Sequence, residues 1–191
     1  MIKKVLTKVL LGSFLVSSTL MASSSEYLYD TKSLVGFEGG FGGINVKAAP
    51  INDGYIDIGH GGLKIGAQTQ DYRLFLSGRY FAGDNFNKIT TLGAEFQYMF
   101  HVASFMDFFL GVNAGMLSID YDDVANVNRE ISDVYYGGDV GANFILSDLI
   151  DFEIGARLMS IQADNTIGGV TYTFDDIISG YASIIFKYEM D

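Results

Sequence analysis

Residues 92–100, LGAEFQYMF, decide the fold of this 191-residue chain. Successive side chains of an extended strand point to opposite faces, so this stretch would present one apolar face and one face of small and polar groups. An α-helix would mix the two kinds on every face. The stretch therefore predicts a β-strand with two chemically different faces. The apolar face would hold Leu92, Ala94, Phe96, Tyr98 and Phe100, and the other face Gly93, Glu95 and Gln97.

The same alternation recurs along the chain and predicts eight strands in one domain. On the third to eighth strands, one set of alternate positions carries no charge, whereas the other carries ionic side chains together with glycines. Those glycines are Gly93, Gly111, Gly115, Gly137, Gly141 and Gly155. The strands are predicted at 34–46, 55–68, 72–82, 88–100, 105–120, 133–146, 150–163 and 174–190.

Two kinds of fold could hold this alternation. A soluble sandwich or lipocalin-like barrel turns its apolar set inward, whereas a membrane barrel turns that set toward lipid. The absence of charge from the apolar set favours lipid, because a basic residue facing the bilayer midplane costs about 2–4 kcal/mol. Aromatic residues also gather at strand ends, as interfacial girdles do. The predicted fold class is all-β: an antiparallel, up-and-down, eight-stranded transmembrane β-barrel.

The connections between predicted strands alternate in length. Short ones are predicted at 69–71, 101–104 and 147–148, and longer ones at 47–54, 83–87, 121–132 and 164–173. Transmembrane barrels have brief periplasmic turns and longer external loops, so this sorting favours the membrane fold and places the N- and C-termini of the barrel domain in the periplasm.

The N-terminus has the three parts of a secretory signal peptide: basic residues at Lys3, Lys4 and Lys8, a short apolar run, and small residues near Ala22. The apolar run is shorter than the ~20 residues that a spanning helix needs. We therefore expect a signal peptide at 1–22 and the barrel domain at 23–191.

Composition limits the classes of partner and chemistry. Residues 1–22 hold three lysines and no acid, so the net charge of −11 becomes −14 without them. Such an anionic protein is not expected to bind nucleic acid. The chain has no cysteine, which excludes disulfides and thiol chemistry.

The polar set predicts an ionic network inside the barrel. Eight strands enclose a lumen only wide enough for side chains to fill, and a charge there needs a partner. Register predicts Asp139 across from Arg157 and Asn143 across from Glu153. We interpret the network first as a polar core and second as a narrow, gated conduit. Its predicted members are Glu38, Lys64, Arg73, Arg79, Glu95, Asp139, Glu153, Arg157 and Lys187.

No catalytic or metal site is predicted. His60 falls on the inward set and His101 in a periplasmic turn, and neither has a serine and an acid at triad spacing on the lipid face. Two separated histidines do not make a zinc site. The acidic residues at 120–123 lack the glycine and terminal glutamate of a calcium loop and predict a solvated external loop. We expect no enzymatic activity, no metal and no cofactor.

The glycine-rich first strand GFEGGFGGINV (36–46), together with the signal peptide, the eight strands and the sorted loops, resembles the small outer-membrane barrels. The nearest families are the transmembrane domain of outer membrane protein A and the outer membrane protein X group. The chain departs from them by ending without an aromatic residue.

This resemblance implies a non-enzymatic protein of the cell outer membrane with a structural or surface role, and leaves a narrow porin-like conduit open. The expected partners are outer-membrane lipid, lipopolysaccharide and the barrel assembly machinery, with no expectation about the oligomeric state. Two alternatives stay open: an adhesin-like module that binds a partner through its external loops, and a secreted soluble barrel that binds a small apolar ligand.

Overall fold

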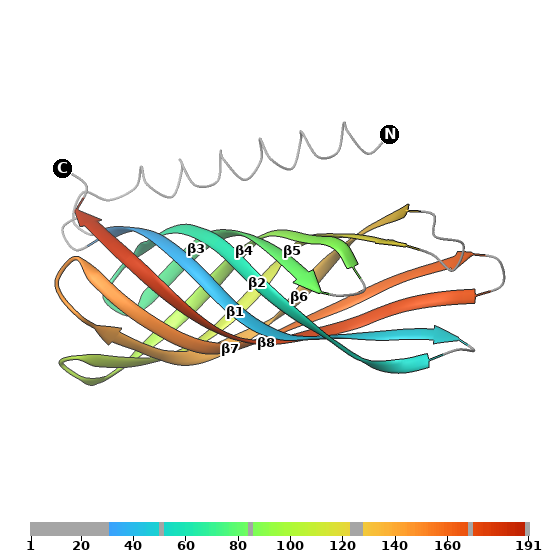
Figure 1. Cartoon of the computed structure of the whole chain (residues 1–191). Coiled ribbons are helices and arrows are strands. Elements are labelled where there is room, and N and C mark those ends of the chain that lie inside the picture. The colour runs from blue at the N-terminus through green and yellow to red at the C-terminus, as the bar shows by residue number, and fades with distance from the viewer. Residues whose placement is uncertain (1–30, 50–51, 84–85, 123–127, 168–169, 190–191) are drawn as a thin grey trace. The chain divides into compact units, whose positions relative to one another are not determined.

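Backbone pairing joins all eight strands into one closed barrel (Figure 1). The computed structural model describes residues 31–49, 52–83, 86–122, 128–167 and 170–189. Each strand pairs antiparallel with the next, and β1 pairs with β8. The predicted fold class is therefore confirmed, whereas the signal peptide expected at 1–22 lies outside the described residues. The strands are β1 (Lys32–Ala49), β2 (Asn52–Gln68), β3 (Tyr72–Gly83), β4 (Phe86–Ala103), β5 (Met106–Asp122), β6 (Asn128–Ile145), β7 (Ile150–Ile167) and β8 (Val170–Glu189).

The two ends of the barrel differ. We call the end where β1 begins and β8 ends the terminal end, and the opposite one the hairpin end. Most residues predicted as long connections at the hairpin end belong to strands instead, since β6 already begins at Asn128 and β7 continues to Ile167. The predicted loop lengths are thus wrong. Antiparallel hydrogen bonding continues through these polar residues because a two-stranded ladder needs no apolar face.

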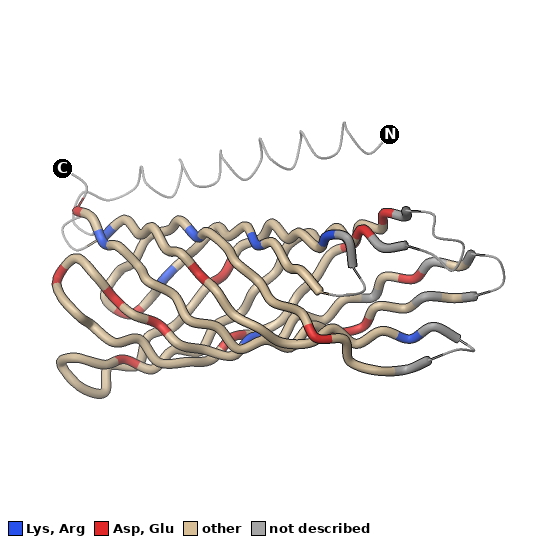
Figure 2. The backbone as a smooth tube through the Cα atoms, in the orientation of Figure 1, with Lys and Arg blue, Asp and Glu red and all other residues tan. Residues whose placement is uncertain are grey.

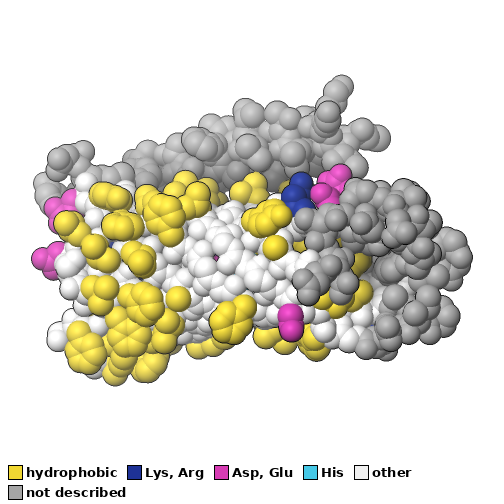
Figure 3. Space-filling view, in the orientation of Figure 1, with side chains coloured by type: hydrophobic (Ala, Val, Ile, Leu, Met, Phe, Trp, Pro, Cys, Tyr) yellow, Lys and Arg dark blue, Asp and Glu magenta, His cyan; other side chains and the backbone are white. Residues whose placement is uncertain are grey.

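The apolar set faces outward. Leu74, Leu76, Leu110 and Val112 are each more than half exposed, and apolar side chains gather in patches on the face shown in Figure 3. Aromatic rings on the same outer surface contact one another near the terminal end, where Tyr98 lies 4.7 Å from Phe100 between ring centroids. An apolar belt with an aromatic rim is the surface that lipid requires. The described residues contain no helix long and apolar enough to cross a membrane.

The predicted register between β6 and β7 is confirmed. Asp139 lies opposite Arg157, and Asn143 opposite Glu153. Glu38, Lys64, Arg73, Glu95 and the other inward charges are at most 6% exposed, so the polar set lines the lumen.

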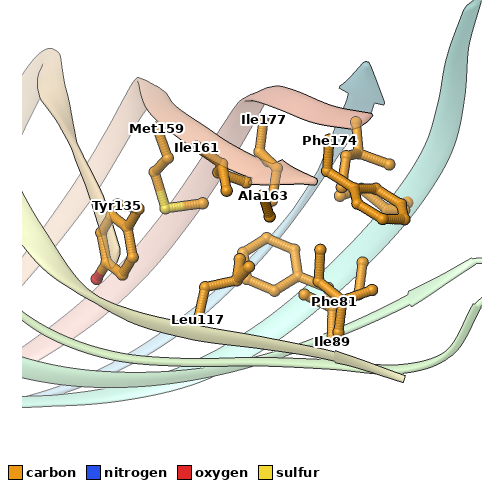
Figure 4. Packing of buried hydrophobic residues seen from close by; sticks show 12 residues of the cluster. Phe81, Ile89, Leu117, Tyr135, Met159, Ile161, Ala163, Phe174 and Ile177 are labelled. Atoms are coloured by element: carbon orange, nitrogen blue, oxygen red, sulfur yellow. The ribbon is translucent and has the colours of Figure 1, made fainter. Parts of the chain in front are cut away.

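The lumen has a second layer that the sequence analysis did not predict. Toward the hairpin end the inward residues are apolar and pack against one another across the barrel (Figure 4). The predicted ionic residues therefore account only for the charged part of the lumen, nearer the terminal end. We call this group the apolar layer: Ile44, Ile58, Phe81, Ile89, Leu117, Ile119, Tyr135, Met159, Ile161, Ala163, Phe174 and Ile177.

Inward glycines give the larger lumenal side chains their space. A methyl group at Gly93 would collide with the hydroxyl of Tyr135 and stand 2.6 Å from the carbonyl oxygen of Ala114. A methyl group at Gly155 would stand 2.8 Å from the ring of Tyr181. These glycines are therefore required by close approach across a narrow lumen.

We predict that Gly93→Ala destabilises the barrel by about 1–3 kcal/mol, because the added methyl overpacks the lumen. The matched control is Gly78→Ala on the outer face, where the nearest atom to the new methyl is 3.9 Å away. Urea-induced unfolding in lipid vesicles measures the free energy of unfolding of both variants. Equal stability of the two would contradict the close-packing account.

Candidate functional site in the lumen

The carboxylate of Glu38 is the centre of the charged part of the lumen. Its Oε1 accepts hydrogen bonds from Arg157 at 2.6 Å, from Arg79 at 2.7 Å and from His60 Nε2 at 3.1 Å. Lys64 Nζ stands 3.8 Å from Oε2. These four partners, three hydrogen-bond donors and one ion-paired lysine, come from β2, β3 and β7, so Glu38 ties three other strands to β1.

Glu95 on β4 completes the same cluster. Arg157 donates to its Oε2 at 3.1 Å, and Arg79 donates to its Oε1. Each arginine therefore bridges Glu38 and Glu95, which lie on strands β1 and β4. The planar guanidinium, with five donors in a fixed fork, suits such bridging better than a lysine would.

A second cluster lies nearer the terminal end. Asp151 contacts both Arg73 and Lys187 at 2.6 Å, and Lys64 contacts Glu153 at 2.6 Å. Arg73 also donates to the amide oxygen of Asn143 at 3.0 Å. Because Lys64 reaches carboxylates of both clusters, the charged residues form one continuous network, and Figure 2 shows their positions distributed over several strands.

Most of the predicted site residues are brought together here, with one exception. Glu38, Lys64, Arg73, Arg79, Glu95, Glu153, Arg157 and Lys187 belong to the network. Asp139 does not make the ion pair that its register suggested, because the guanidinium of Arg157 turns to Glu38 and Glu95 instead. Gln97 and Asn113 donate to Asp139 at 3.0 and 3.3 Å.

The sequence analysis missed Asp151. This residue is 1% exposed and pairs with two cations, so it is as central to the network as Glu153. Its inward position was available from period 2, since it is two residues before Glu153. It was overlooked because it lies next to the predicted start of its strand, where a polar residue is also typical of a turn.

Aromatic faces supplement the ion pairs. The guanidinium carbon of Arg157 lies 4.3 Å from the ring centroid of Tyr181, and Lys64 Nζ lies 4.9 Å from that of Phe75. A ring face attracts a cation, which favours holding these charges in a site with little water. The charged layer is thus fixed by packing as well as by hydrogen bonds.

The histidines have structural partners. His60 marks the boundary of the two layers, bonded to Glu38 on one side and 4.9 Å from Phe81 between ring centroids on the other. His101 lies within β4, which continues to Ala103. The turn predicted at 101–104 is therefore shorter than expected. Among the described residues, no group of three or more histidines, cysteines or acids could hold a metal.

His101 lies at the rim of the terminal end, near the end of β4, where it joins β5 to the turn between β2 and β3. Its Nδ1 lies 2.7 Å from a carboxylate oxygen of Asp107, and its Nε2 lies 2.9 Å from the carbonyl oxygen of Gln70. Neither partner can donate, so both contacts are hydrogen bonds only when both ring nitrogens carry protons. The hydrogen bond to Asp107 accordingly raises the pKa of His101 above its ordinary value.

No protein-family model and no curated protein matches this sequence. Solved structures do match it. Neisserial surface protein A aligns with a TM-score of 0.61 at 15% identity over 83% of this chain and 97% of that one. OprG, an outer membrane protein from Pseudomonas aeruginosa, gives 0.52 at 12% over 84% and 97%. The outer membrane protein AlkL gives 0.50 at 12% over 88% and 95%. The fold is therefore that of the small eight-stranded outer-membrane barrels.

We predict that Glu38→Ala destabilises the barrel by about 3–5 kcal/mol, because two buried arginines lose a counter-charge. Glu130→Ala, at an exposed carboxylate, is the control and should change stability by less than about 0.5 kcal/mol. The double change Glu38→Leu with Arg79→Met removes one charge of each sign and should recover part of the loss. A Glu38→Ala variant as stable as the control would refute the conclusion that Glu38 is the centre of the charged network.

We predict a pH-dependent contribution from His101. Because its folded pKa is raised, the contribution is fully present below the ordinary pKa of 6.5 and is lost as the pH rises through the raised value. The urea midpoint should therefore fall over that range in the native chain, and His101→Asn should show a smaller fall. Identical pH profiles for both chains would rule this out.

Proposed function

We propose that this protein is a closed, non-enzymatic barrel of the outer membrane with a structural and surface role. The observation that carries the proposal is the filling of the lumen by two layers of different chemistry. Toward the terminal end, each of four carboxylates, Glu38, Glu95, Asp151 and Glu153, lies within 4.0 Å of at least two cationic side chains. Toward the hairpin end, the apolar layer spans the barrel.

The two layers oppose conduction for different reasons. An ion that enters the charged layer must displace arginines that are fixed by several hydrogen bonds each. An ion that enters the apolar layer must lose its water among side chains such as Phe81, Ile89 and Met159, which are all 0% exposed. Hydrophobic constrictions close channels by excluding water. The porin-like interpretation would require both layers to rearrange together.

A filled barrel is a rigid membrane anchor. Its apolar outer surface suits outer-membrane lipid, and the assembly machinery that inserts such barrels is the second expected partner. Lipopolysaccharide would meet the hairpin end, where Lys47 pairs with Asp175 and Lys88 lies 3.3 Å from Asp120. These pairs leave a surface of mixed charge for bridging to anionic sugars.

One observation favours an adhesin-like surface role as a second candidate. In the described pairing, β2 pairs with β3 only from Gly59 onward, and β6 pairs with β7 only from Tyr135 onward. The hairpin-end parts of β2 and β6 therefore each have one free edge, with Tyr55 and Val134 more than half exposed beside it. A free edge can receive an extended segment of a partner by strand addition. Adhesion of cells that display the barrel to immobilised matrix proteins tests this role, and equal adhesion without the barrel would contradict it.

We predict that the purified protein is silent in planar bilayers over a range of voltage and pH. Glu38→Ala alone should stay silent because the apolar layer remains. Phe81→Ala with Met159→Ala should also stay silent because the charged layer remains. Only the triple variant should conduct. Stepwise conductance from the native chain would overturn the closed barrel and favour the conduit.

A further inference from the structure

Two turns at the terminal end carry exposed apolar side chains. Val102 and Phe105 lie at the turn between β4 and β5, and Leu146 and Leu149 lie at the turn between β6 and β7. These four side chains are 58–66% exposed. The turn between β2 and β3, at the same end, has the polar residues 69–71 instead. Figure 3 shows apolar side chains gathered at the end of the molecule where the first two turns lie in Figure 1.

The apolar turn residues continue the lipid-facing surface of the strands. Val102 is the next outward position of β4 after Phe100, and Leu146 follows Phe144 of β6 at the same spacing of two residues. The ring of Phe144 lies 6.4 Å from that of Phe152 between centroids, on the outer surface beside the β6–β7 turn. The lipid-facing surface therefore extends into both turns with no polar outward position between strand and turn.

The length of the apolar surface on β7 gives a second reason to place a turn in lipid. A strand needs about 9–11 residues to cross the hydrocarbon layer. On β7 the outward apolar positions run only from Phe152 to Leu158, which is seven residues, and the next outward position is Ser160. Counted from Leu149, the run is ten residues long. β7 therefore reaches the length of a membrane span only if the β6–β7 turn lies within the bilayer.

The backbone of the β6–β7 turn satisfies its own polar groups. The amide nitrogens of Leu146 and Ser147 both donate to the carbonyl oxygen of Ile150 at 3.0 Å. The amide nitrogens of Leu149 and Ile150 donate to the hydroxyl of Ser147 at 3.3 and 3.1 Å. The carbonyl oxygen of Leu149 accepts from the amide of Lys187 on β8 at 2.8 Å. A turn that lies among lipid must meet this condition, because little water is there to replace missing partners.

We propose that the β4–β5 and β6–β7 turns insert into the membrane leaflet at the terminal end, with their four apolar side chains at the boundary between acyl chains and headgroups. The partner of this surface is membrane lipid, which removes these side chains from water. Asp148, exposed at the tip of the second turn, then lies among headgroups. His101 stays at the mouth of the lumen, bonded to the buried Asp107.

The inserted turns give the barrel a definite placement in the bilayer. Because the β2–β3 turn is polar, it stays in water, and the barrel lies deeper on the side of β4 to β7 than on the side of β2 and β3. This placement rests on the membrane-spanning barrel and does not depend on the closed lumen proposed above.

The chain contains no tryptophan, so one introduced tryptophan reports its own surroundings. Phe105→Trp and Leu149→Trp place it at the two turns, Leu110→Trp on the lipid-facing surface of β5, and Gln70→Trp at the polar turn of the same end. Each full-length variant is folded into phosphatidylcholine nanodiscs, where water reaches both ends of the barrel, and heat-modifiable gel mobility confirms folding. Lipid brominated on its acyl chains should quench Phe105→Trp and Leu149→Trp several-fold more strongly than Gln70→Trp. Acrylamide in the water should quench them several-fold less.

The outcomes separate lipid from other surroundings of the turns. Quenching of the two turn variants by brominated lipid, close to that of Leu110→Trp, supports the insertion. Turn variants that acrylamide quenches as strongly as Gln70→Trp would place both turns in water and overturn it. Shielding from both quenchers would show that protein covers the turns, and would overturn it as well. Absence of lipid quenching in Leu110→Trp would instead overturn the premise that the barrel spans the membrane, and the insertion with it.

Discussion

Every strand of this protein depends on one constraint: backbone amides and carbonyls that lie among lipid must find their hydrogen-bond partners within the chain. β1 meets it by pairing with β2 on one side and β8 on the other, which closes the sheet. A ring of only eight strands encloses a space that side chains alone can fill. The pairing of large residues with glycines follows from this narrow space, as Tyr135 over Gly93 and Tyr181 over Gly155 illustrate.

The narrow lumen also explains why its charges form a network instead of separate pairs. A carboxylate such as Glu38 cannot reach bulk water, so it must be satisfied by side chains from other strands. Arginine reaches across the lumen and can serve two carboxylates, which makes the layer rigid and its parts interdependent. The apolar layer beyond it needs no such pairing, and it separates the charged layer from the hairpin end. The packing of the lumen and the stability of the barrel thus depend on the same residues.

Local patterns predicted much of this architecture. The two-residue period of strands such as Tyr72–Gly83 identified which residues face lipid. The turn near Ser147 predicted which residues of β7 lie opposite Asp139 and Asn143 of β6. The same patterns failed at the hairpin end. There the polar residues of β6 and β7 indicated loops, although the ladder continues through them. The apolar layer was also missed, because an apolar residue such as Ile119 has the same chemistry whether it faces lipid or a packed lumen.

The period of the side chains and the pairing of neighbouring strands are local properties, and the amino-acid sequence specified them: which face is apolar, that the sheet is antiparallel, and that Asp139 stands beside Arg157. The partners across the lumen are not local. Arg157 bonds to Glu38, 119 residues away in the chain, because closure of β1 onto β8 brings that carboxylate within reach. Strand order around the ring and the reach of each side chain select such contacts. They also leave Asp139 with neutral partners, an outcome that no spacing along the chain predicts.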